Sequence, residues 1–510
     1  HGKEQSAGDK AEQRATASPY EQRVQESVEA TSALSSHGEL SPRKRLELLF
    51  DDGCFKELQQ LTMQAPLPFG RQKRLPGDGV ITAIGEVNGR PVAAVANVYN
   101  FMGGSIGVRT TKKIAELYRL AGEAGAPVVT FAESAGARLQ EGVDIMEACG
   151  FEWSARAKYS GVIPQIAAVT GPCIGAAAVT SALSDLVMWT DKGVLALAGP
   201  KVVQQATGED LSYEEIGGAS LHGQHTGLCH RVCSSEEALI EEIRAVLSLL
   251  PANNTEEPPE RATNDKAERL TPEIGEILKA AGNKGFDCRQ VIEALVDDGW
   301  FYEIAPDYGP AVVAGFAYLD GMAVAIVANQ SKVMSGALDT DACRKGARFF
   351  QFVNAFNFPV VSLVDVPGAL PTVDETKKGL LNALVRFVME SCNFQGPRVS
   401  LLLRKCFGGA YACLNPKSGG GDIVYAYPDS SVGIMSGKAL ASVLFKDKAE
   451  ETLKKIGCRL DDPLLAAERG YLDDIIEPKN TRFDIIRALR FVRRKRILGF
   501  PPKRNANGPL

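Results

Sequence analysis

Four glycine turns that follow apolar runs carry the residues best suited to chemistry. The first half has "VTFAESAGARLQEG" (129–142) and "AAVTGPCIGAAAV" (167–179), and the second half has "VSLVDVPGAL" (361–370) and "VSLLLRKCFGGAYAC" (399–413). Each reads as a buried strand that leads into a turn and a helix. Small residues at such turns let a substrate oxygen reach two backbone N–H groups, reinforced by the helix dipole. The pattern predicts two oxyanion sites, which suit a reaction that joins two activated carbonyl compounds.

These turns belong to an internal repeat. "GEVNGRPVAAVAN" (85–97) returns as "AYLDGMAVAIVAN" (317–329), an offset of 232 (321 − 89). At that offset Gly136 meets Gly368, and farther on Gly175 faces Gly409 at an offset of 234 (409 − 175). A register kept over strands, helix and turn predicts two similar α/β domains. We place them at 1–255 and 256–510, joined by a Pro- and Asn-rich linker over 251–273.

The segment before each domain also repeats. "FDDGCFKEL" (50–58) is echoed by "VDDGWFYEI" (296–304). Ahead of the first copy, Ser41 and Pro42 are typical of an N-cap and a first helical position. We therefore expect an introductory helix in both halves.

Composition excludes several classes of protein. The chain has 510 residues, 45% of them hydrophobic, and a net charge of −5, which argues against nucleic acid as the main partner. No apolar run approaches the ~18 residues of a membrane span, so no membrane partner is expected. The 11 cysteines are scattered without paired knuckles, which excludes a zinc ribbon and indicates reduced, packed thiols. These features predict a cytoplasmic enzyme; a removed transit peptide would instead place it in the mitochondrial matrix.

Other catalytic patterns fit poorly. The five histidines all lie in the first half, and no G-x-S-x-G elbow supplies a serine nucleophile. His222, His225 and His230 are interpreted as a polar loop, and no metal is expected. "GIMSGKAL" (433–440) has the wrong spacing for a phosphate loop, and "GGSIG" (103–107) reads as a tight turn before a helix.

Several long motifs carry a resemblance to a known family. They are "SAGARLQEGV" (134–143), "SGVIPQIAAVTGPCIGAAA" (160–178), the run from "IVANQSKVMSGALD" to "VSLVDVPG" (326–368), "LRKCFGGAY" (403–411) and "AERGYLDDIIEP" (467–478). Over roughly residues 20–510 the chain resembles the carboxyltransferase (β) subunits of biotin-dependent acyl-CoA carboxylases, of the propionyl-CoA carboxylase type. The resemblance implies two tandem crotonase-like domains and a homohexamer. It also implies active sites between the first domain of one subunit and the second domain of its neighbour.

The resemblance assigns roles to turn residues. The first domain would hold the acyl-CoA thioester oxygen and the second the ureido oxygen of carboxybiotin. The implied catalytic residues are Gly175, Ala176, Gly409 and Ala410. The implied cofactor-binding residues are Gly136, Ala137, Gly368, Gly408 and Tyr411, and the implied substrate residues are Ala412, Gly104, Gly171 and Pro172. The small Ala412 favours an acyl group larger than acetyl.

The implied chemistry explains the missing histidine base. Carboxybiotin releases CO2, its ureido nitrogen takes the α-proton, and the thioester enolate attacks CO2, so that the protein supplies two oxyanion holes worth roughly 3–4 kcal/mol each. No biotin attachment motif or ATP-grasp pattern occurs in the sequence. Biotin is therefore expected on a carrier subunit, with a separate biotin carboxylase, and coenzyme A as part of the substrate.

Three alternatives stay open. The half-reaction could run backwards, in a biotin-dependent acyl-CoA decarboxylase. A crotonase-type isomerase or hydratase would need a carboxylate base, for which Glu133 and Glu141 are available. A non-catalytic assembly subunit is the third, because 370–390 and 415–441 depart from the family pattern.

Overall fold

A computed structural model of the chain describes residues 18–35, 37–69, 75–446, 450–451 and 461–495. The chain divides into two compact units that meet between Asn254 and Thr255, one residue from the boundary expected from the repeat. We call them unit 1 and unit 2. In the described residues no helix has both the length and the apolar character to cross a membrane.

Unit 1 is built on a mixed sheet. Its described residues form eight strands in the order β1-β2-β3-β4-β5-β6-β8, with β7 paired to β5. The β1–β3 segment is antiparallel, and the pairs from β3 onward are parallel. The strands are β1 (Phe55–Leu58), β2 (Val80–Val87), β3 (Arg90–Asn97), β4 (Val128–Ser134), β5 (Gln165–Ile174), β6 (Leu186–Thr190), β7 (Val194–Ala196) and β8 (Arg231–Cys233).

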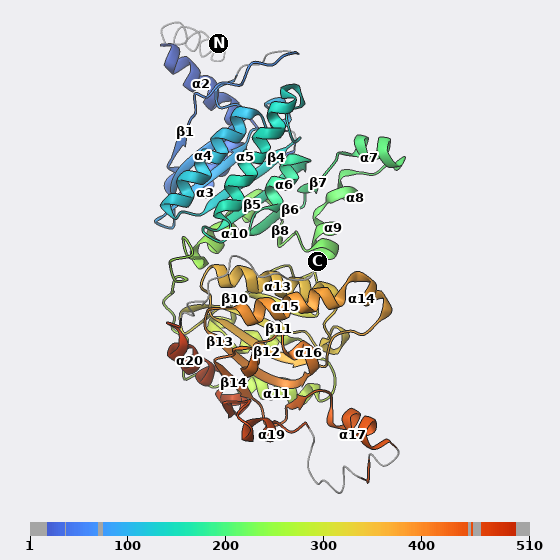
Figure 1. The fold of residues 1–510 in the computed structure, drawn as a ribbon. Helices are drawn as coiled ribbons and strands as arrows, with labels where there is room; N and C mark the ends of the chain where they lie inside the picture. Colours follow the sequence, from blue (N-terminus) through green and yellow to red (C-terminus); the bar gives the residue numbers. More distant parts are fainter. Residues whose placement is uncertain (1–17, 36, 70–74, 447–449, 452–460, 496–510) are drawn as a thin grey trace, which may run out of the picture. The chain divides into compact units, whose positions relative to one another are not determined.

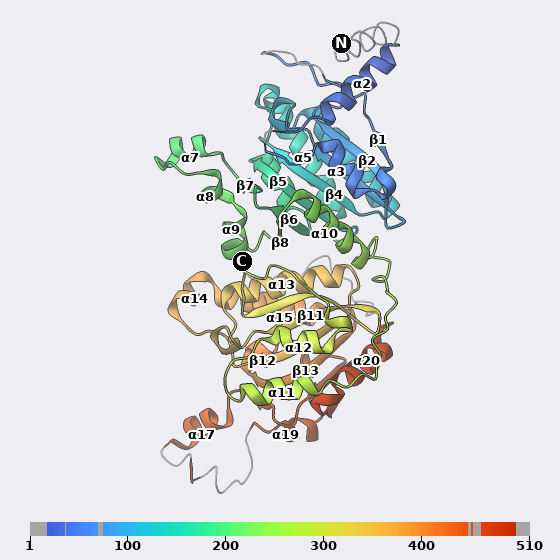
Figure 2. The ribbon, with the colours of Figure 1, turned by 180° about the vertical axis from the view of Figure 1, so that it is seen from behind.

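Helices cover both faces of this sheet. One face carries α4 and α5, and the other carries α3 and α10 (Figures 1 and 2). Apolar side chains of α4 pack on Val95 and Val128, because alternate strand residues point to the same face. The helices are α2 (Pro19–Thr31), α3 (Pro42–Leu49), α4 (Val108–Ala124), α5 (Val143–Tyr159), α6 (Ala176–Ala182), α7 (Pro200–Thr207), α8 (Tyr213–Gly217), α9 (Ala219–Leu221) and α10 (Glu236–Leu249).

Unit 2 repeats this plan. Its described residues form an eight-stranded sheet in the order β16-β14-β13-β12-β11-β10-β9, with β15 paired to β13. The strands are β9 (Phe301–Glu303), β10 (Val312–Leu319), β11 (Met322–Asn329), β12 (Val360–Val366), β13 (Arg398–Phe407), β14 (Ile423–Ala426), β15 (Ser431–Gly433) and β16 (Asp474–Ile475).

The helices of unit 2 also lie on both faces of its sheet. In Figures 1 and 2, α13 and α15 lie on one face and α11, α12 and α20 on the other. The helices are α11 (Pro272–Ala281), α12 (Cys288–Leu295), α13 (Thr340–Ala355), α14 (Val373–Lys378), α15 (Leu380–Asn393), α16 (Gly408–Tyr411), α17 (Gly437–Phe445), α19 (Pro463–Glu468) and α20 (Thr481–Val492).

The predicted duplication is confirmed. β2, β3 and β4 reappear as β10, β11 and β12 at the predicted offset, and α3 reappears as α12. Ser41 caps α3 by accepting from the Lys44 N–H, as expected, and Asp287 caps α12. A short turn precedes α4 in unit 1 and α13 in unit 2, with Gly104 and Gly336 at positive φ.

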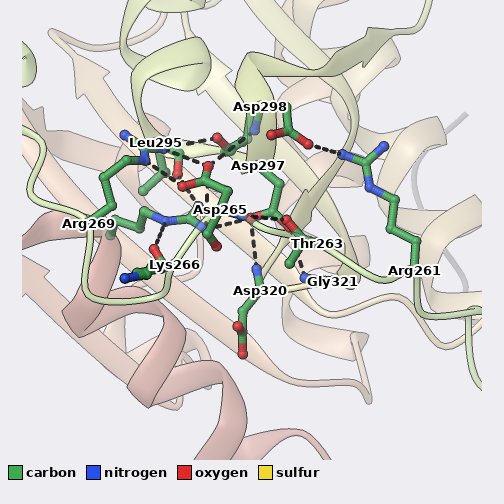
Figure 3. Close-up of polar contacts among 12 residues, drawn as sticks. Arg261, Thr263, Asp265, Lys266, Arg269, Leu295, Asp297, Asp298, Asp320 and Gly321 are labelled. Atoms are coloured by element: carbon green, nitrogen blue, oxygen red, sulfur yellow. Dashed lines mark hydrogen bonds and ion pairs between the residues drawn. The ribbon is translucent and has the colours of Figure 1, made fainter.

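A buried ion pair ties the repeat's introductory helix to its sheet. Asp297 accepts hydrogen bonds from the N–H groups of Asp320 and Gly321, at 2.9 and 2.8 Å, and pairs with Arg482 of α20 at 2.6 Å (Figure 3). Unit 1 makes the same contacts with Asp51 and Arg244, although this pair is only half-buried. Each carboxylate accepts hydrogen bonds from two amides of the β-hairpin turn and pairs with an arginine of the last helix. These contacts hold the hairpin against the last helix of each unit.

The predicted linker is largely packed onto unit 2. The Arg261 N–H donates to the carbonyl of Gly321, and Asp265 pairs with Arg269 at 2.7 Å (Figure 3). Thr271 is fully buried. The segment lacks helix and strand up to α11, as its composition predicts, but most of it is held by contacts and is not a free tether.

One buried cation differs between the repeats. Lys113 of α4 donates to the carbonyls of Gly77 and Val80, at 2.9 and 2.8 Å. Its counterpart Lys345 of α13 is equally buried, yet its Nζ has no hydrogen-bond acceptor among the described residues. Burial lowers the pKa of each lysine to about 8. An unpaired buried ammonium opposes folding.

We expect Lys345→Met to stabilise the protein at pH 7.5 by up to about 3 kcal/mol. The charged lysine is less stable in the folded state than in the unfolded state, as its lowered pKa shows, and methionine removes that difference. In the wild type, the unfolded lysine keeps its proton up to its ordinary pKa of 10.5, so the Lys345 contribution to stability should rise between pH 8 and 10.5. The variant should lose that rise. Urea unfolding of the full chain at several pH values measures both effects.

Lys113→Met is the matched control. Lys113→Met should increase the free energy of unfolding less than Lys345→Met does, or decrease it, because the carbonyls of Gly77 and Val80 lose their hydrogen-bond donor. Equal responses of the two variants, or a destabilised Lys345→Met protein, would contradict this account.

Candidate active site

In unit 1 the turn after β4 is held against the loop before α4. The Ile106 N–H donates to the Gly136 carbonyl and the Arg138 N–H to the Ile106 carbonyl, both at 2.8 Å. The amide of Ala137, between them, has no acceptor in the described part of the chain. Gly136 has φ +98°, which a side chain rarely adopts. The turn therefore presents one unused backbone donor.

The turn after β5 lies directly beside it. A Cβ at Gly136 would come 2.5 Å from the Ile174 carbonyl and 3.9 Å from the Ala176 nitrogen. Gly175 turns the chain at φ +58°, and its own N–H donates to the Ala196 carbonyl at 2.8 Å. The N–H of Gly175 is therefore already used within the protein and does not face a ligand.

The donors at this turn are the next residues. The amides of Ala176 and Ala177 have no acceptor among the described residues. The role of Gly175 is conformational, because its positive φ aims those amides away from the sheet. With seven residues in α6, the local amides matter more than the helix dipole.

Two predicted substrate residues lie elsewhere. From the sequence a turn was expected at Gly171 and Pro172. Both residues are instead buried within β5. A Cβ at Gly171 would come 2.9 Å from Cγ of Glu133. Gly104 is likewise a packing glycine, because a Cβ there would come 2.4 Å from the Glu133 carbonyl. We find no opening to substrate at these three positions.

Unit 2 repeats the pair of turns with one change of register. Gly408, at φ +63°, occupies the place of Gly175, since β5 and β13 end one residue before each of them. The sequence alignment paired Gly175 with Gly409 and was off by one. Gly409 therefore matches Ala176, and the amides of Gly409 and Ala410 have no acceptor among the described residues.

The turn in unit 2 is more open than that in unit 1. A Cβ at Gly368 or at Gly409 would meet nothing within 4 Å. Ala410 is buried, whereas Tyr411 and Ala412 are half-buried beside the turn. Burial raises the pKa of the Tyr411 hydroxyl, which therefore stays protonated as a donor. The second unit thus offers room for a bulkier group.

A buried carboxylate lies beneath each pair of turns. In unit 1, Glu133 accepts from both terminal nitrogens of Arg45 at 3.1 Å and from the hydroxyl of Ser35 at 2.6 Å. In unit 2, Asp365 accepts from Arg404 at 2.6 Å and from the N–H of Lys405 at 3.1 Å. Both carboxylates are fully buried.

The sequence did not reveal these pairs. The arginine that pairs with the carboxylate comes from α3 in unit 1 (Arg45) and from β13 in unit 2 (Arg404). The two arginines therefore do not lie at equivalent positions of the repeat. Only an acidic residue at the same place in both β4 and β12 could have signalled them.

The carboxylates considered as bases are both engaged. Glu133 is held as described, and Glu141 accepts from the Val108 N–H at 2.5 Å and from Arg138 at 3.1 Å. The thiols below the turns are equally unavailable, because burial raises the pKa of Cys173 to about 12. His222 and His230 contact backbone, at the Leu195 carbonyl and the Val187 N–H respectively. None of these groups is free to act as a base, whereas the turns leave backbone donors unused by the described residues.

Comparison with known proteins gives the family. The carboxyl transferase domain matches residues 34–507. The chain is 37% identical over 485 residues to the carboxyltransferase subunit of propionyl-CoA carboxylase from Haloferax mediterranei, covering 93% of this chain and 94% of that protein. It is 38% identical over 480 residues to the α subunit of methylmalonyl-CoA decarboxylase from Veillonella parvula, with the same coverage. The chain belongs to the carboxyl transferase family.

A solved structure agrees with this assignment. A crystal structure of transcarboxylase 12S, described as a hexamer with methylmalonyl-CoA bound, superposes with a TM-score of 0.92 at 34% identity, covering 97% of this chain and 99% of that one. The predicted fold of two tandem crotonase-like units is confirmed. The protein is a carboxyltransferase of the biotin-dependent acyl-CoA carboxylase and decarboxylase type.

For this carboxyltransferase we expect Glu133→Gln to fold and to keep its transfer rate within about threefold. Arg45 retains Glu236, which it contacts at 2.8 and 2.9 Å, and the amide oxygen still accepts from Arg45. Removal of a general base would instead cost about 10²–10⁴-fold. The measurement is kcat for carboxyl transfer, with circular dichroism as the check on folding.

Glu141→Gln serves as the parallel variant. A loss above a hundredfold in a folded Glu133→Gln protein, with Glu141→Gln unaffected, would assign Glu133 as a base and revive the isomerase alternative.

Proposed function

We propose that the protein moves a carboxyl group between carboxybiotin on a carrier protein and the α-carbon of a short acyl-CoA, of the propionyl and methylmalonyl class. The observation that carries this proposal is the repeated turn with unused backbone amides, once in each unit. Two electrophilic carbonyl groups must be polarised in such a transfer, and the repeat supplies one turn for each.

Unit 1 is the proposed acyl-CoA side. The thioester oxygen would accept from the amide of Ala176, with Ala137 or Ala177 as the second donor. Gly136 lets these two turns come together, because a Cβ there would lie 2.5 Å from the Ile174 carbonyl. Donors fixed by the sheet need no rearrangement as negative charge develops on the enolate oxygen, so they favour the transition state over the bound thioester.

Unit 2 is the proposed biotin side. The ureido oxygen would accept from Gly409 and Ala410, and Gly368, Gly408 and Tyr411 would frame the ring. The open space at Gly368 and Gly409 fits a bicyclic group, which the tighter turn of unit 1 would exclude. When bound, carboxybiotin supplies the CO2 and the ureido nitrogen that accepts the α-proton.

The small side chain of Ala412 supports the choice of acyl group, because the resemblance implies that this position in the second domain of a neighbouring subunit borders the acyl chain. It is half-buried next to the turn, and a larger residue there would reduce the space for carbon beyond the α-position. Propionyl-CoA carboxylase and methylmalonyl-CoA decarboxylase, both among the relatives, are named for such branched or extended acyl groups.

The proposed partners follow from the half-reaction. A biotin carrier and a biotin carboxylase would be separate subunits, and we propose a homohexamer, as reported for transcarboxylase 12S. The net direction would be set by those partners. The decarboxylase direction is a second candidate, favoured by the two methylmalonyl-CoA decarboxylase relatives at 38% and 36% identity.

The test is transfer of label without ATP. Carboxyl-labelled methylmalonyl-CoA and a biotinylated carrier domain should exchange label in the presence of this chain alone, because this half-reaction needs no nucleotide. Absence of label on the carrier, with bound acyl-CoA detected, would overturn the proposal.

In the same assay Gly409→Val should lose at least a hundredfold in rate. Its φ is not positive and the new side chain meets no protein atom, so folding should persist while the valine occupies the ureido oxygen's place. Gly150→Val on α5, equally open and equally without positive φ, is the matched control and should stay active. Full activity of a folded Gly409→Val protein would remove the unit 2 site.

A further inference from the structure

A pocket of about 460 Å³ lies between the outer surfaces of α13 and α15 in unit 2. Arg344, Arg348 and Gln351 line it from α13, three to four residues apart and therefore on one face of that helix. Asn382 and Arg386 line it from α15 in the same way. The end of α14 completes the rim, with Lys377 and Lys378.

The hollow is built into the packing of the two helices. Ala347 and Ala383 form its floor and are 4% and 8% exposed. The helices approach closely there, since a Cβ at Gly346 would come 2.4 Å from the ring of Phe387. Because Ala347 and Ala383 are small and the side chains at the rim are long, a cavity remains between the helices. The contact between Gly346 and Phe387 fixes the spacing of the two helices below it.

The lining is strongly basic. It holds five cationic side chains and no carboxylate. Carboxylates outside the lining reach three of them: Asp341 lies 3.4 Å from Arg344, Glu375 2.9 Å from Lys378, and Glu390 3.7 Å from Arg386. These three cations are half-exposed, so such pairs hold them weakly and leave them available to a ligand. The pocket thus keeps an excess of positive charge.

The start of α15 adds to this field. Gly379, which lines the pocket, begins the 14-residue helix in a left-handed conformation with no side-chain cap. The first amides of α15 and the positive end of its dipole therefore lie at the same place as the cations.

We propose that this pocket binds a small organic polyphosphate of the nucleoside diphosphate class. Guanidinium groups pair with phosphate oxygens in a bidentate manner, and the volume is within the range of small-ligand sites. The amides of Gln351 and Asn382 can pair with a sugar hydroxyl or a base edge. The concave alanine floor favours a small ligand over a flat acidic protein surface. Neither turn of the proposed active site lines the pocket, so the binding test stands apart from the proposed function; only the acyl-CoA source considered below rests on it.

The test is calorimetric titration of the full chain with adenosine 3′,5′-bisphosphate and with ADP. Arg344→Gln/Arg386→Gln should weaken binding at one site per chain by at least tenfold, and added NaCl should weaken the wild type in parallel. Arg487→Gln removes an exposed arginine from α20, on the opposite face of the sheet, and should leave binding unchanged. Affinity unchanged in the double variant, or a wild type that binds neither nucleotide, would overturn the proposal.

Steady-state kinetics separates two sources of the nucleotide. If the pocket takes the phosphorylated end of an acyl-CoA, the double variant should raise KM for acyl-CoA at least fivefold with kcat unchanged. If it takes a free nucleotide, KM should stay constant while ADP binding is lost. Loss of carboxyl transfer in Gly409→Val has no bearing on either result, so failure of the two proposals can be told apart.

Discussion

Both sites lie beside an irregularity in the sheet that holds a buried carboxylate. The pairing of β4 with β5 shifts between Ala132 and Ser134, and that of β12 with β13 between Val364 and Val366. The residues at the breaks are Glu133 and Asp365. A carboxylate buried there is tolerated only because an arginine neutralises it. Pairing resumes for one residue, between Ser134 and Cys173 in unit 1 and between Val366 and Cys406 in unit 2, and β4 and β12 then end. The turns that follow in unit 1, like those at the end of β13 in unit 2, keep backbone amides that no described residue accepts.

The two units solve the same problem with different residues. Opposite the break, unit 1 has Gly171 and unit 2 has Arg404. Glycine makes room for the longer Glu133, whose arginine then comes from α3; arginine at the same place reaches the shorter Asp365 directly. The turns differ as well, since a Cβ at Gly136 would meet the Ile174 carbonyl whereas one at Gly368 would meet nothing within 4 Å. This difference gives a physical reason for a duplicated fold to bind two unlike partners.

The sequence predicted the buried strands, the repeat and the glycine turns that follow β4 and β12, because apolar runs and glycine respond to local backbone demands. It could not predict that Gly171 and Pro172 stay inside β5, since the irregular pairing opposite Glu133 lengthens that strand. The pairing of Gly175 with Gly408 was missed by one residue, because the glycine that follows Gly408 fits the same alignment. Arg45 and Arg404 were missed because contacts between distant elements leave no spacing to read.

The central claim is that the protein supplies backbone donors and no base. The most direct measurement is deuterium exchange at the α-carbon of propionyl-CoA in D2O, followed by mass spectrometry. The account predicts no exchange above background with the carboxyltransferase alone, and exchange once a carboxylated biotin carrier is added, because the ureido nitrogen becomes a base only when carboxybiotin loses CO2. Exchange catalysed by the protein without biotin would show that one of its own side chains removes the proton, and would contradict the account.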